Sequence, residues 1–345
     1  MPADISLESK IAFLRQPRSF PEPTFRVEAV ETHMSWVFLT DAYAYKLKKP
    51  VHYDLLDFST LEARHYYCEE EVRLNRRLAP TVYLGVAALG MDQYGDLQLE
   101  GKNSIVDWLV KMRRLPASGM LDYALRHAGV SERDLDRVAA RLADFYRNSE
   151  PIAAEPETYR GALYEDIDRT LQVLSRPDYR LPAGQVHAIC RAQQAVLKNM
   201  PEMFDARVRA GKIVEGHGDL RPEHICIEPE VAVIDCLEFS RKLRIVDAAD
   251  EMAFLALECE RLDAADAGTR LLHGYSERCN DRPSPALLHF YQCYRACLRA
   301  RISISHLDEE KFRYSAEWRR RAGDYLQLAQ KHQDSISSAI EPPVR

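Results

Sequence analysis

The sequence predicts an α+β protein of two lobes, a small β-rich N-terminal lobe over residues 1–115 and a larger helical lobe over residues 116–345. Three observations predict this fold class. Strand-like segments gather within residues 25–114 around one long helical pattern. From residue 116 onward the sequence is mostly helical, and a polar loop with short strands interrupts it once, at residues 212–240. A chain of 345 residues is also long enough for two lobes or domains.

The N-terminal lobe is expected to hold a sheet of about five strands and one helix. The segment "SWVFLTDAYAYKLKK" predicts two strands around a turn at Thr40–Ala42. In "DFSTLEARHYYCEEEVRLNRRLAP", Ser59 and Glu62 form a capping box, the helical pattern continues to Leu78, and Pro80 ends it. The segments "TVYLGVAAL" and "SIVDWLVKMRRL" predict further strands.

The C-terminal lobe is expected to be a helical bundle. Ser131 and Asp134 form a second capping box, which opens the helix "SERDLDRVAARLADFYRN". The segment "PALLHFYQCYRACLRARISISHL" is apolar on most sides and therefore predicts a central, buried helix. Further helices are expected at residues 161–176, 184–200 and 247–262.

Composition narrows the classes of protein and partner. The net charge of −6 disfavours a dedicated nucleic-acid binder. No apolar run reaches the roughly 18 residues of a membrane span, and the first residues lack the pattern of a secretory signal. The eight cysteines form no C-x-x-C pair, so we expect reduced, buried thiols and a cytoplasmic location. The sequence does not fix the oligomeric state.

The densest group of polar residues is the segment "EGHGDLRPEHICI". Asp219 lies five residues before His224, and Asp235 closes the strand "VAVID" after a turn at residues 228–230. Phosphoryl transfer needs a group that orients the attacking hydroxyl, ligands for a metal ion and a cation on the phosphates. The two aspartates and the histidine stand at spacings that suit the first two of these tasks.

These residues resemble the motif of the aminoglycoside phosphotransferase-like kinases, which is H-G-D-x-x-x-x-N followed by I-D. "HGDLRPEH" and "VID" match it except at His224. The whole chain is similar to an uncharacterised bacterial subfamily of phosphotransferase-like proteins in the segments "SWVFLTDAYAYKLKKPV", "KMRRLP" and "HGDLRPEHI", over roughly residues 25–305. The resemblance implies a two-lobed, protein-kinase-like fold and a transferase that uses ATP.

The resemblance also implies a role for each matching residue. Asp219 would accept or orient the proton of the substrate hydroxyl, and Asp235 would hold Mg²⁺ against the phosphates. His224 stands where the family usually has a metal-binding asparagine. Because Mg²⁺ prefers oxygen ligands, an imidazole at this position makes Mn²⁺ the alternative ion. His217 and Gly218 would shape the loop.

A kinase also needs a strand lysine that contacts the phosphates and a helix glutamate that holds it. Strand alternation places Ala44 and Lys46 on one face, with the small alanine leaving room for adenine. Lys48 shares this face, so the choice of lysine stays open, and a basic edge strand facing water is the alternative. Glu71 falls on the apolar face of its helix, where it would be costly unless paired, and it is the expected partner of Lys46.

The adenine base would contact the backbone after the strand "WLVKM", at Met112, Arg113 and Arg114. A glycine-rich phosphate loop is not evident, because "VETHMS" stands between the first two strands. The residues that could take its place are Thr32, His33 and Ser35.

The sequence therefore predicts an ATP-dependent phosphotransferase that moves the γ-phosphate to a hydroxyl of a small molecule. The alternatives are a nucleotide-binding pseudokinase with a regulatory role, a kinase that acts on a protein, and a metal hydrolase that uses His217, Asp219 and His224. An acceptor site is expected in the helical lobe, where Tyr291, Arg295 and Arg299 share one helix face. That face would suit a phosphorylated or carboxylated substrate. Ordinary packing and surface charge are the other interpretation.

Overall fold

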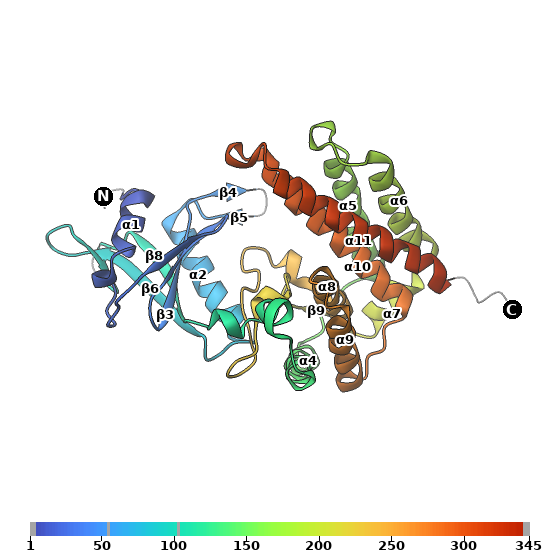
Figure 1. The fold of residues 1–345 in the computed structure, drawn as a ribbon, viewed down its shortest axis with the longest axis horizontal. Coiled ribbons are helices and arrows are strands. Elements are labelled where there is room, and N and C mark those ends of the chain that lie inside the picture. The colour runs from blue at the N-terminus through green and yellow to red at the C-terminus, as the bar shows by residue number, and fades with distance from the viewer. Residues whose placement is uncertain (1–4, 54–55, 102–103, 341–345) are drawn as a thin grey trace. The chain divides into compact units, whose positions relative to one another are not determined.

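The computed structural model describes residues 5–53, 56–101 and 104–340 and has two compact units (Figure 1). The first unit runs to Ala124 and also contains Glu223–Leu243, and the second contains Leu125–Pro222 and the chain from Arg244 onward. An antiparallel sheet dominates the first unit and helices dominate the second, which confirms the α+β class. The boundary at residue 115 between an ATP-binding lobe and a substrate lobe stays a prediction.

Among the described residues, the main sheet of the first unit has six strands, one more than expected, in the order β1-β2-β3-β8-β6-β7. Every neighbouring pair is antiparallel. The lysine strand β3 lies between β2 and β8, so it is not an edge strand. The strands are β1 (Glu28–Glu31), β2 (Ser35–Leu39), β3 (Tyr43–Lys48), β6 (Tyr83–Met91), β7 (Leu97–Leu99) and β8 (Asp107–Arg113), with a separate pair β4 (His52–Tyr53) and β5 (Leu56–Asp57).

The two faces of this sheet have separate cores, because side chains alternate along each strand. On one face, Tyr45 and Leu47 pack in a cluster with Leu14 of α1 (Leu7–Leu14). On the other face, Ala44 packs with Val72 of α2 (Leu61–Asn75). The second face carries the lysines, and α2 is the helix expected to carry their glutamate.

Helix α2 begins and ends slightly differently from the prediction. Thr60, not Ser59, is its N-cap, and the Thr60 hydroxyl accepts a hydrogen bond from the N–H of Ala63. Ser59 instead donates to the Asp57 carboxylate, at 2.6 Å from its hydroxyl and 2.9 Å from its N–H. The competing Asp57 acceptor therefore displaces the cap by one residue. The helix ends at Asn75 rather than at Leu78.

The segment Glu223–Leu243 belongs to the first unit and carries a small hairpin. Strands β10 (Ile225–Cys226) and β11 (Ala232–Val233) pair antiparallel around the expected turn. Cys226 and Ala232 join the same cluster as Ala44. The hairpin thereby holds His224 at one end and Asp235 just past the other. A short helix, α3 (Leu121–Tyr123), ends the first part of this unit.

The second unit is a helical bundle with one short strand pair, β9 (Ile213–Glu215) and β12 (Ile245–Asp247). The Ser131 cap is confirmed, because its hydroxyl accepts from the N–H of Asp134. Its helices are α4 (Glu132–Arg147), α5 (Pro156–Leu174), α6 (Ala183–Asn199), α7 (Glu202–Arg209), α8 (Ala248–Arg261), α9 (Ala265–Cys279), α10 (Pro285–Ser305) and α11 (Ala316–Ile340). The helices expected at residues 161–176, 184–200 and 247–262 are thus confirmed within a few residues.

The core of this bundle forms around α8 and α10. Helix α8 is buried along its length from Ala248 to Cys259, and α10 contributes Phe290, Tyr291 and Cys293 to the same cluster as Phe254. The prediction of a buried central helix at α10 is confirmed. Within the described residues the cysteines are free, and all but Cys279 are buried.

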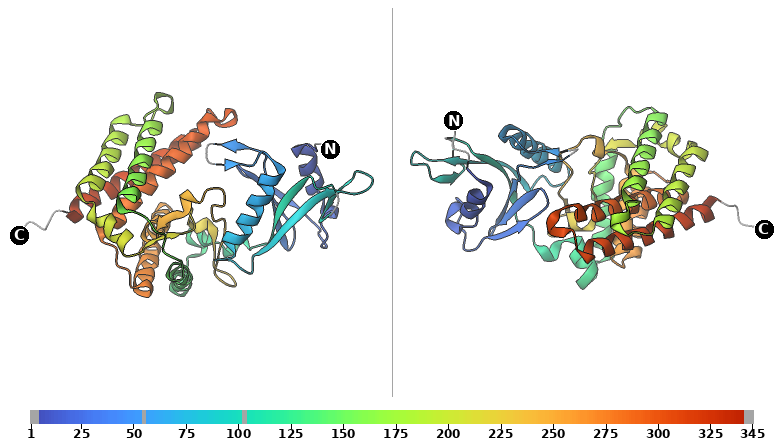
Figure 2. Two further views of the ribbon diagram at one scale, coloured as in Figure 1. Left: turned by 180° about the vertical axis from the view of Figure 1, so that it is seen from behind. Right: turned by 90° about the horizontal axis from the view of Figure 1, so that it is seen from above.

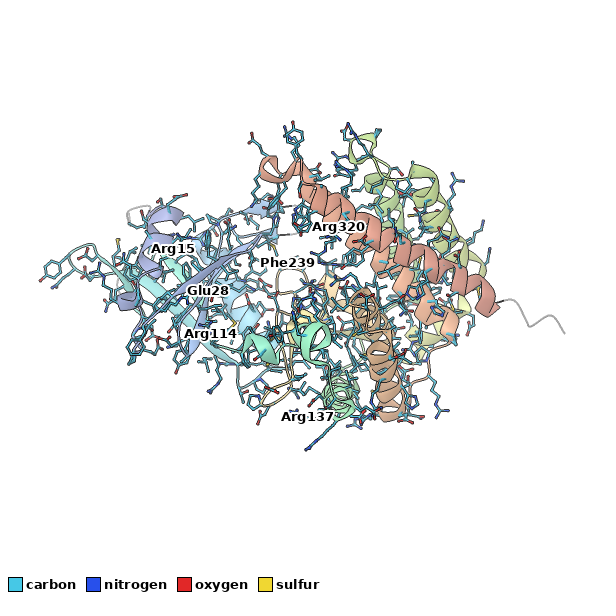
Figure 3. The ribbon with its side chains drawn as sticks, viewed as in Figure 1. Arg15, Glu28, Arg114, Arg137, Phe239 and Arg320 are labelled. Atoms are coloured by element: carbon cyan, nitrogen blue, oxygen red, sulfur yellow. The ribbon has the colours of Figure 1, made fainter. Side chains whose placement is uncertain are left out.

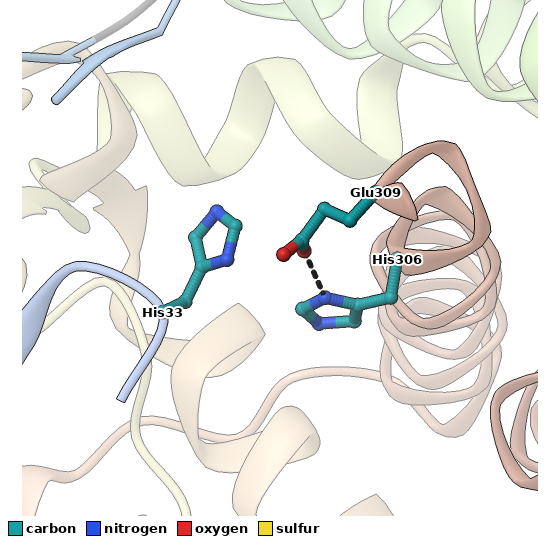
Figure 4. Close-up of side chains that lie close together, drawn as sticks. All are labelled: His33, His306 and Glu309. Carbon is teal, nitrogen blue, oxygen red and sulfur yellow. Dashed lines mark hydrogen bonds and ion pairs between the residues drawn. The ribbon is translucent and has the colours of Figure 1, made fainter. Parts of the chain in front are cut away.

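Helix α11 was not expected from the sequence. It lies alongside α10 in the views of Figures 1 and 2 and packs against it. The connection between the two helices is fixed by His306, whose Nδ1 lies 3.0 Å from Oε1 of Glu309 (Figure 4). The His306 ring also stacks on Trp318 of α11, with ring centroids 4.0 Å apart. Within the part of the chain that the structure describes, no helix has the length and apolar character that a membrane span requires.

Candidate active site

The first unit brings four of the predicted site residues together. Lys46 projects from β3, and its Nζ lies 2.9 Å from Oε1 of Glu71 on α2 and 2.8 Å from Oδ1 of Asp235. Nε2 of His224 lies 3.5 Å from Oδ2 of the same aspartate. The lysine therefore joins the helix glutamate to the aspartate expected to hold a metal ion.

A second lysine extends this cluster. Nζ of Lys48, two residues along the same strand face, lies 2.6 Å from Oε2 of Glu71 and also bonds Oε1 of Glu238. The side chains of Lys48 and Glu71 are both fully buried. Each oxygen of Glu71 thus receives one ammonium group. The alternative of a basic edge strand facing water is excluded for Lys46 and Lys48.

The ion pairs offset the cost of burying these charges. Burial opposes the charge of Lys46, but the carboxylates of Asp235 and Glu71 outweigh it and raise the pKa of Lys46 well above its ordinary value. Burial likewise favours neutral Glu71, whereas Lys46 and Lys48 outweigh it and lower the pKa of Glu71. The cluster is therefore charged at neutral pH.

The backbone around Asp235 is held by side chains of the first unit. Asp235 has φ = 62°, in the left-handed region that aspartate tolerates better than most residues. Its N–H donates to the hydroxyl of Tyr83 at 3.1 Å. The next N–H, that of Cys236, donates to Oδ1 of Asn75 at 2.9 Å, and Asn75 in turn donates to the carbonyl of Glu71. Helix α2 thus positions both the glutamate and the aspartate.

The pair of His224 and Asp235 fits a divalent ion in part. Ligand atoms about 2.0–2.1 Å from one ion lie at most about 4.2 Å apart, and the observed 3.5 Å is within this limit. The Asp235 side chain is 47% exposed, so an ion can reach it. Imidazole is a common ligand of Mn²⁺ and a poorer one of Mg²⁺. The donor set is therefore compatible with either ion, completed by phosphate oxygens or water.

The expected adenine contacts lie on neighbouring strands. Ala44 and Met112 face each other in the β3–β8 register and are nearly buried. The N–H of Arg113 donates to Val82 O at 2.8 Å, and that of Arg114 donates to Ala42 O at 2.9 Å. These two backbone donors are already engaged within the protein. An adenine ring at this strand end would use other backbone groups.

The Arg114 side chain also serves the first unit internally. Its Nη1 donates to Thr40 O at 2.7 Å, and its Nη2 lies 3.6 Å from Oε2 of Glu28 (Figure 3). This side chain ties the end of β8 to the strands β1 and β2.

The turn between β1 and β2 is closed by its own hydrogen bonds. The N–H of Thr32 donates to Ser35 O at 2.8 Å, and the N–H of Ser35 donates to the Thr32 hydroxyl at 3.0 Å. Nζ of Lys49 donates to Thr32 O at 2.6 Å. The N–H groups of Thr32 and Ser35 are thus engaged in the turn, in contrast to the open donors of a glycine-rich loop.

In the second unit, the loop that carries Asp219 is fixed by a buried glutamate. Glu251 of α8 is fully buried, and its carboxylate accepts hydrogen bonds from the N–H of His217 at 2.8 Å and from the N–H of Gly218. It also accepts from the hydroxyl of Tyr146 at 2.9 Å. Gly218 has φ = 90°, a backbone conformation that favours glycine, in agreement with its expected part in shaping the loop. The loop thus rests on one carboxylate of α8.

Asp219 itself lies among arginines. Its Oδ2 is 2.8 Å from Nη2 and 3.0 Å from Nε of Arg221, and its Oδ1 is 3.8 Å from Nη1 of Arg299 on α10. Its N–H donates to Nδ1 of the buried His217 at 3.3 Å. Asp219 lies in the second unit, whereas the predicted nucleotide and metal residues lie in the first.

Two of the three residues of the expected acceptor face are engaged in packing. The hydroxyl of Tyr291 donates to Oδ2 of Asp247 at 3.0 Å, and Arg295 bonds both oxygens of Asp250 at 2.8 and 2.5 Å. All four residues are buried. For Tyr291 and Arg295 the packing interpretation is therefore the right one, while Arg299 lies beside Asp219.

Three residues of these sites were missed or left undecided by the sequence prediction. The sequence prediction did not include Glu251, although an acid within the apolar segment "DEMAFLALE" is a usable signal. Glu238, three residues after Asp235, carries no pattern that separates a functional from a surface role, and in the structure it is 8% exposed and bonded to Lys48. Arg221 carried no signal beyond its place next to the motif aspartate.

Comparison with solved structures shows which proteins have a similar fold. A choline/ethanolamine kinase family protein from Mesorhizobium loti superposes with a TM-score of 0.58 at 16% identity, over 96% of this chain and 98% of that one. A mutant of aminoglycoside 2'-phosphotransferase-IIIa in its GDP complex gives 0.55 at 14% identity, over 97% and 99%. LicA in complex with AMP gives 0.56 at 15% identity, over 96% and 100%. The chain therefore has the two-lobed, kinase-like fold of these proteins, as predicted.

Sequence comparison finds relatives of unassigned activity. Uncharacterized proteins of Mycobacterium tuberculosis and Mycobacterium bovis are each 32% identical to this chain over 313 residues, which is 89% of this chain. The match covers 59% of each relative, so the chain spans less than two thirds of the length of the curated relatives it matches. No family model matches the sequence.

Proposed function

We propose that the chain is a phosphotransferase that moves the γ-phosphate of ATP to a hydroxyl of a small molecule. The observation that carries the proposal is the contact of Lys46 with both Glu71 and Asp235, at 2.9 and 2.8 Å. A strand lysine held by a helix glutamate beside an aspartate is the arrangement that kinases use to bind nucleotide phosphates. The kinase-like fold supports the same conclusion.

In this proposal the first unit binds the nucleotide. Lys46 contacts the phosphates while Glu71 fixes its ammonium group, and Ala44 and Met112 contact the adenine ring. His224 and Asp235 hold Mg²⁺ or Mn²⁺, which supplies positive charge to the phosphate oxygens when bound. Because Lys46 and Asp235 are in contact, the ammonium group and the metal ion would act on the same phosphates from neighbouring side chains.

Asp219 acts on the acceptor. Its carboxylate accepts the proton of the acceptor hydroxyl, the hydroxyl oxygen forms a bond to the γ-phosphorus, and the bond from that phosphorus to the β,γ-bridging oxygen breaks. ADP leaves with the bridging oxygen, and the proton on Asp219 passes to solvent. Glu251 keeps the Asp219 loop in one conformation through its bonds to the N–H groups of His217 and Gly218.

Nucleotide binding is tested by thermal unfolding with ATP and either metal ion. A ligand at 100 times its dissociation constant stabilises the native state by about 2.7 kcal/mol, so ATP with Mg²⁺ or Mn²⁺ should raise the melting temperature by several degrees. Lys46→Met should abolish the increase. The control is Lys111→Met on β8. The ammonium group of Lys111 pairs with Glu22 and Glu100, at 2.5 and 2.9 Å, and this variant should keep the increase in melting temperature. No increase with either ion in the wild type contradicts nucleotide binding.

Catalysis is tested by the consumption of ATP over a panel of hydroxyl compounds. Asp219→Asn should lower turnover by about 10²–10⁴-fold, the range for a general base, while the shift in melting temperature with ATP persists. Equal ATP consumption by the wild type and Asp219→Asn would favour a nucleotide-binding pseudokinase. GTP belongs in the same panel, because one protein of similar fold was solved with GDP.

A further inference from the structure

Three arginines of α10 differ in how their charges are balanced. Arg295 makes two hydrogen bonds to Asp250, at 2.8 and 2.5 Å. Arg301 bonds Asp166 at 2.9 Å and Thr170 at 2.9 Å. Among the described residues, the ion-pair contact of Arg299 is the single distance of 3.8 Å to Asp219, beyond hydrogen-bond range, and its buried Nε has no hydrogen-bond partner.

The surroundings of Arg299 do not supply the missing carboxylate. The Arg299 side chain is only 12% exposed, and its guanidinium lies 5.9 Å from the centre of the Tyr325 ring on α11. Glu258 of α8 is already engaged, because it accepts from the Tyr325 hydroxyl at 2.7 Å and from Arg261 at 2.8 Å. Burying a cation without a close, hydrogen-bonded anion is costly. Within the described residues, the ion-pair distance of 3.8 Å to Asp219 is thus too long for a hydrogen bond, and Glu258 acts on Arg299 through its charge while bonding other groups.

Asp219 already has a close cation without Arg299. Its Oδ2 is paired with Arg221 at 2.8 and 3.0 Å, and the guanidinium of Arg299 lies farther away, 3.8 Å from Oδ1. A cationic compound that brought its hydroxyl to Asp219 would place its charge near this largely buried guanidinium, whereas an anionic compound could pair with it.

We propose that the acceptor is an anionic hydroxyl compound, and that Arg299 binds its carboxylate or phosphate group while Asp219 receives the hydroxyl proton. This inference rests on the proposed function, because it assigns the second substrate of the same reaction. A guanidinium suits carboxylate and phosphate equally well, since both offer two oxygens to its paired N–H groups.

A second role for Arg299 would be to position Asp219 without touching substrate. The two roles differ in their kinetic effects. Loss of a substrate-binding arginine raises KM for the acceptor more than it lowers kcat, whereas loss of a positioning residue lowers kcat and leaves KM nearly unchanged. The KM-against-kcat split therefore decides between the two roles.

The experiment measures ATP consumption and acceptor-induced thermal shifts over hydroxyl compounds grouped by charge. The anionic group contains glycerol 3-phosphate and glycerate, among other phosphorylated and carboxylated alcohols. The cationic and neutral groups contain choline, ethanolamine and glycerol. We expect responses confined to the anionic group, and the comparison of phosphorylated with carboxylated members shows which anion is bound. A response confined to cationic or neutral compounds, or none from any anionic compound, overturns the inference.

Variants on α10 supply the second measurement. Arg299→Gln should raise KM for the responding acceptor about 10- to 100-fold, the range for losing a hydrogen-bonded charge. Arg299→Lys keeps the charge but not the paired N–H groups, so its KM should lie between those of Arg299→Gln and the wild type. The control is Arg301→Gln, on the same helix but engaged with Asp166, and it should leave KM unchanged. An unchanged KM in Arg299→Gln, with only kcat reduced, overturns substrate binding by Arg299.

Different results would contradict the phosphotransferase function and the anionic acceptor. If ATP with Mg²⁺ or Mn²⁺ produces no thermal shift, the proposed function fails, and with it the reaction to which the acceptor belongs. If ATP binds and a cationic or neutral alcohol is phosphorylated, the phosphotransferase stands and the anionic acceptor is excluded.

Discussion

Replacing Glu251 with glutamine isolates the contribution of one buried carboxylate to the Asp219 loop. The carboxylate accepts three hydrogen bonds, from the N–H groups of His217 and Gly218 and from the Tyr146 hydroxyl. Oε2 takes two of these bonds and Oε1 takes the one from Gly218. Glutamine has almost the same shape but only one acceptor oxygen, so the change removes acceptor capacity and charge without opening a cavity.

The magnitude follows from the bonds that remain. In the better of its two orientations, the glutamine oxygen occupies the place of Oε2 and keeps two bonds, while its amino group faces the N–H of Gly218. One charge-assisted bond is lost, worth about 1.5–3 kcal/mol, and a buried N–H is left without an acceptor, at about 1–3 kcal/mol. These two contributions overlap, so we expect the free energy of unfolding to fall by about 2–4 kcal/mol. Domains are commonly stable by about 5–15 kcal/mol, so the variant should still fold.

The measurement is urea-induced unfolding followed by tryptophan fluorescence, with the wild type and Tyr146→Phe as references. Tyr146→Phe removes one of the three donors and leaves a group of the same shape, so it should cost about 1 kcal/mol or less. Activity should fall in Glu251→Gln even where the protein is fully folded, because the N–H of Gly218, next to Asp219, loses its acceptor.

A change in the free energy of unfolding of less than about 0.5 kcal/mol in Glu251→Gln would refute this account, because a change that small lies within the scatter of ordinary surface substitutions. Full activity in the folded variant would refute the positioning role separately.

Three other perturbations have directions that the structure fixes. Gly216→Ala should destabilise the protein by at least as much as Glu251→Gln in the same urea assay, because a Cβ at this position would overlap the Glu251 carboxylate and lie 2.9 Å from a Val246 methyl group. Wild-type stability of Gly216→Ala would contradict this expectation. Lys48→Met should lower the free energy of unfolding by about 3–5 kcal/mol, because it removes a buried cation shared by the carboxylates of Glu71 and Glu238. An unchanged urea midpoint would contradict this expectation. Burial and the neighbouring His332 lower the pKa of His289, so the contribution of His289 to stability is present above the unfolded pKa near 6.5 and falls as the pH drops below that value. In His289→Gln the melting temperature should therefore depend less on pH between pH 7 and 5, and an unchanged pH dependence would contradict this expectation.

Local signals in the sequence predicted the elements that depend on few residues. The Ser131 cap and the turn at residues 228–230 were right because their hydrogen bonds form within a few positions of the chain. The Thr60 cap was missed by one residue, because Asp57 competes for the Ser59 hydroxyl, and either residue can cap a helix. Helix α11 was missed because its sequence is rich in charge, and it is stabilised by packing on α10 rather than by its own pattern.

The sequence also singled out Lys46 and Glu71, because strand alternation and a costly acid on an apolar face are strong constraints. It could not choose between Lys46 and Lys48, and the structure shows that Glu71 holds both, one on each oxygen. It could not predict the partners of Glu251, because the bonds of this residue reach across 33 and 34 positions to the N–H groups of Gly218 and His217. Such long-range bonds to backbone leave no periodic trace in a sequence.

In the proposed function, each unit meets a different ligand through its own charged side chains. In the first unit, Glu71 holds the ammonium groups of Lys46 and Lys48, and the exposed Asp235 oxygens can take a divalent cation. In the second unit, Asp219 is paired with Arg221, and the largely buried guanidinium of Arg299 lies 3.8 Å from it, where it can pair with an anionic group of the acceptor. Arg299 belongs to α10 and not to the segment "HGDLRPEH". The charge proposed for the acceptor therefore depends on a residue outside the motif from which the reaction was inferred.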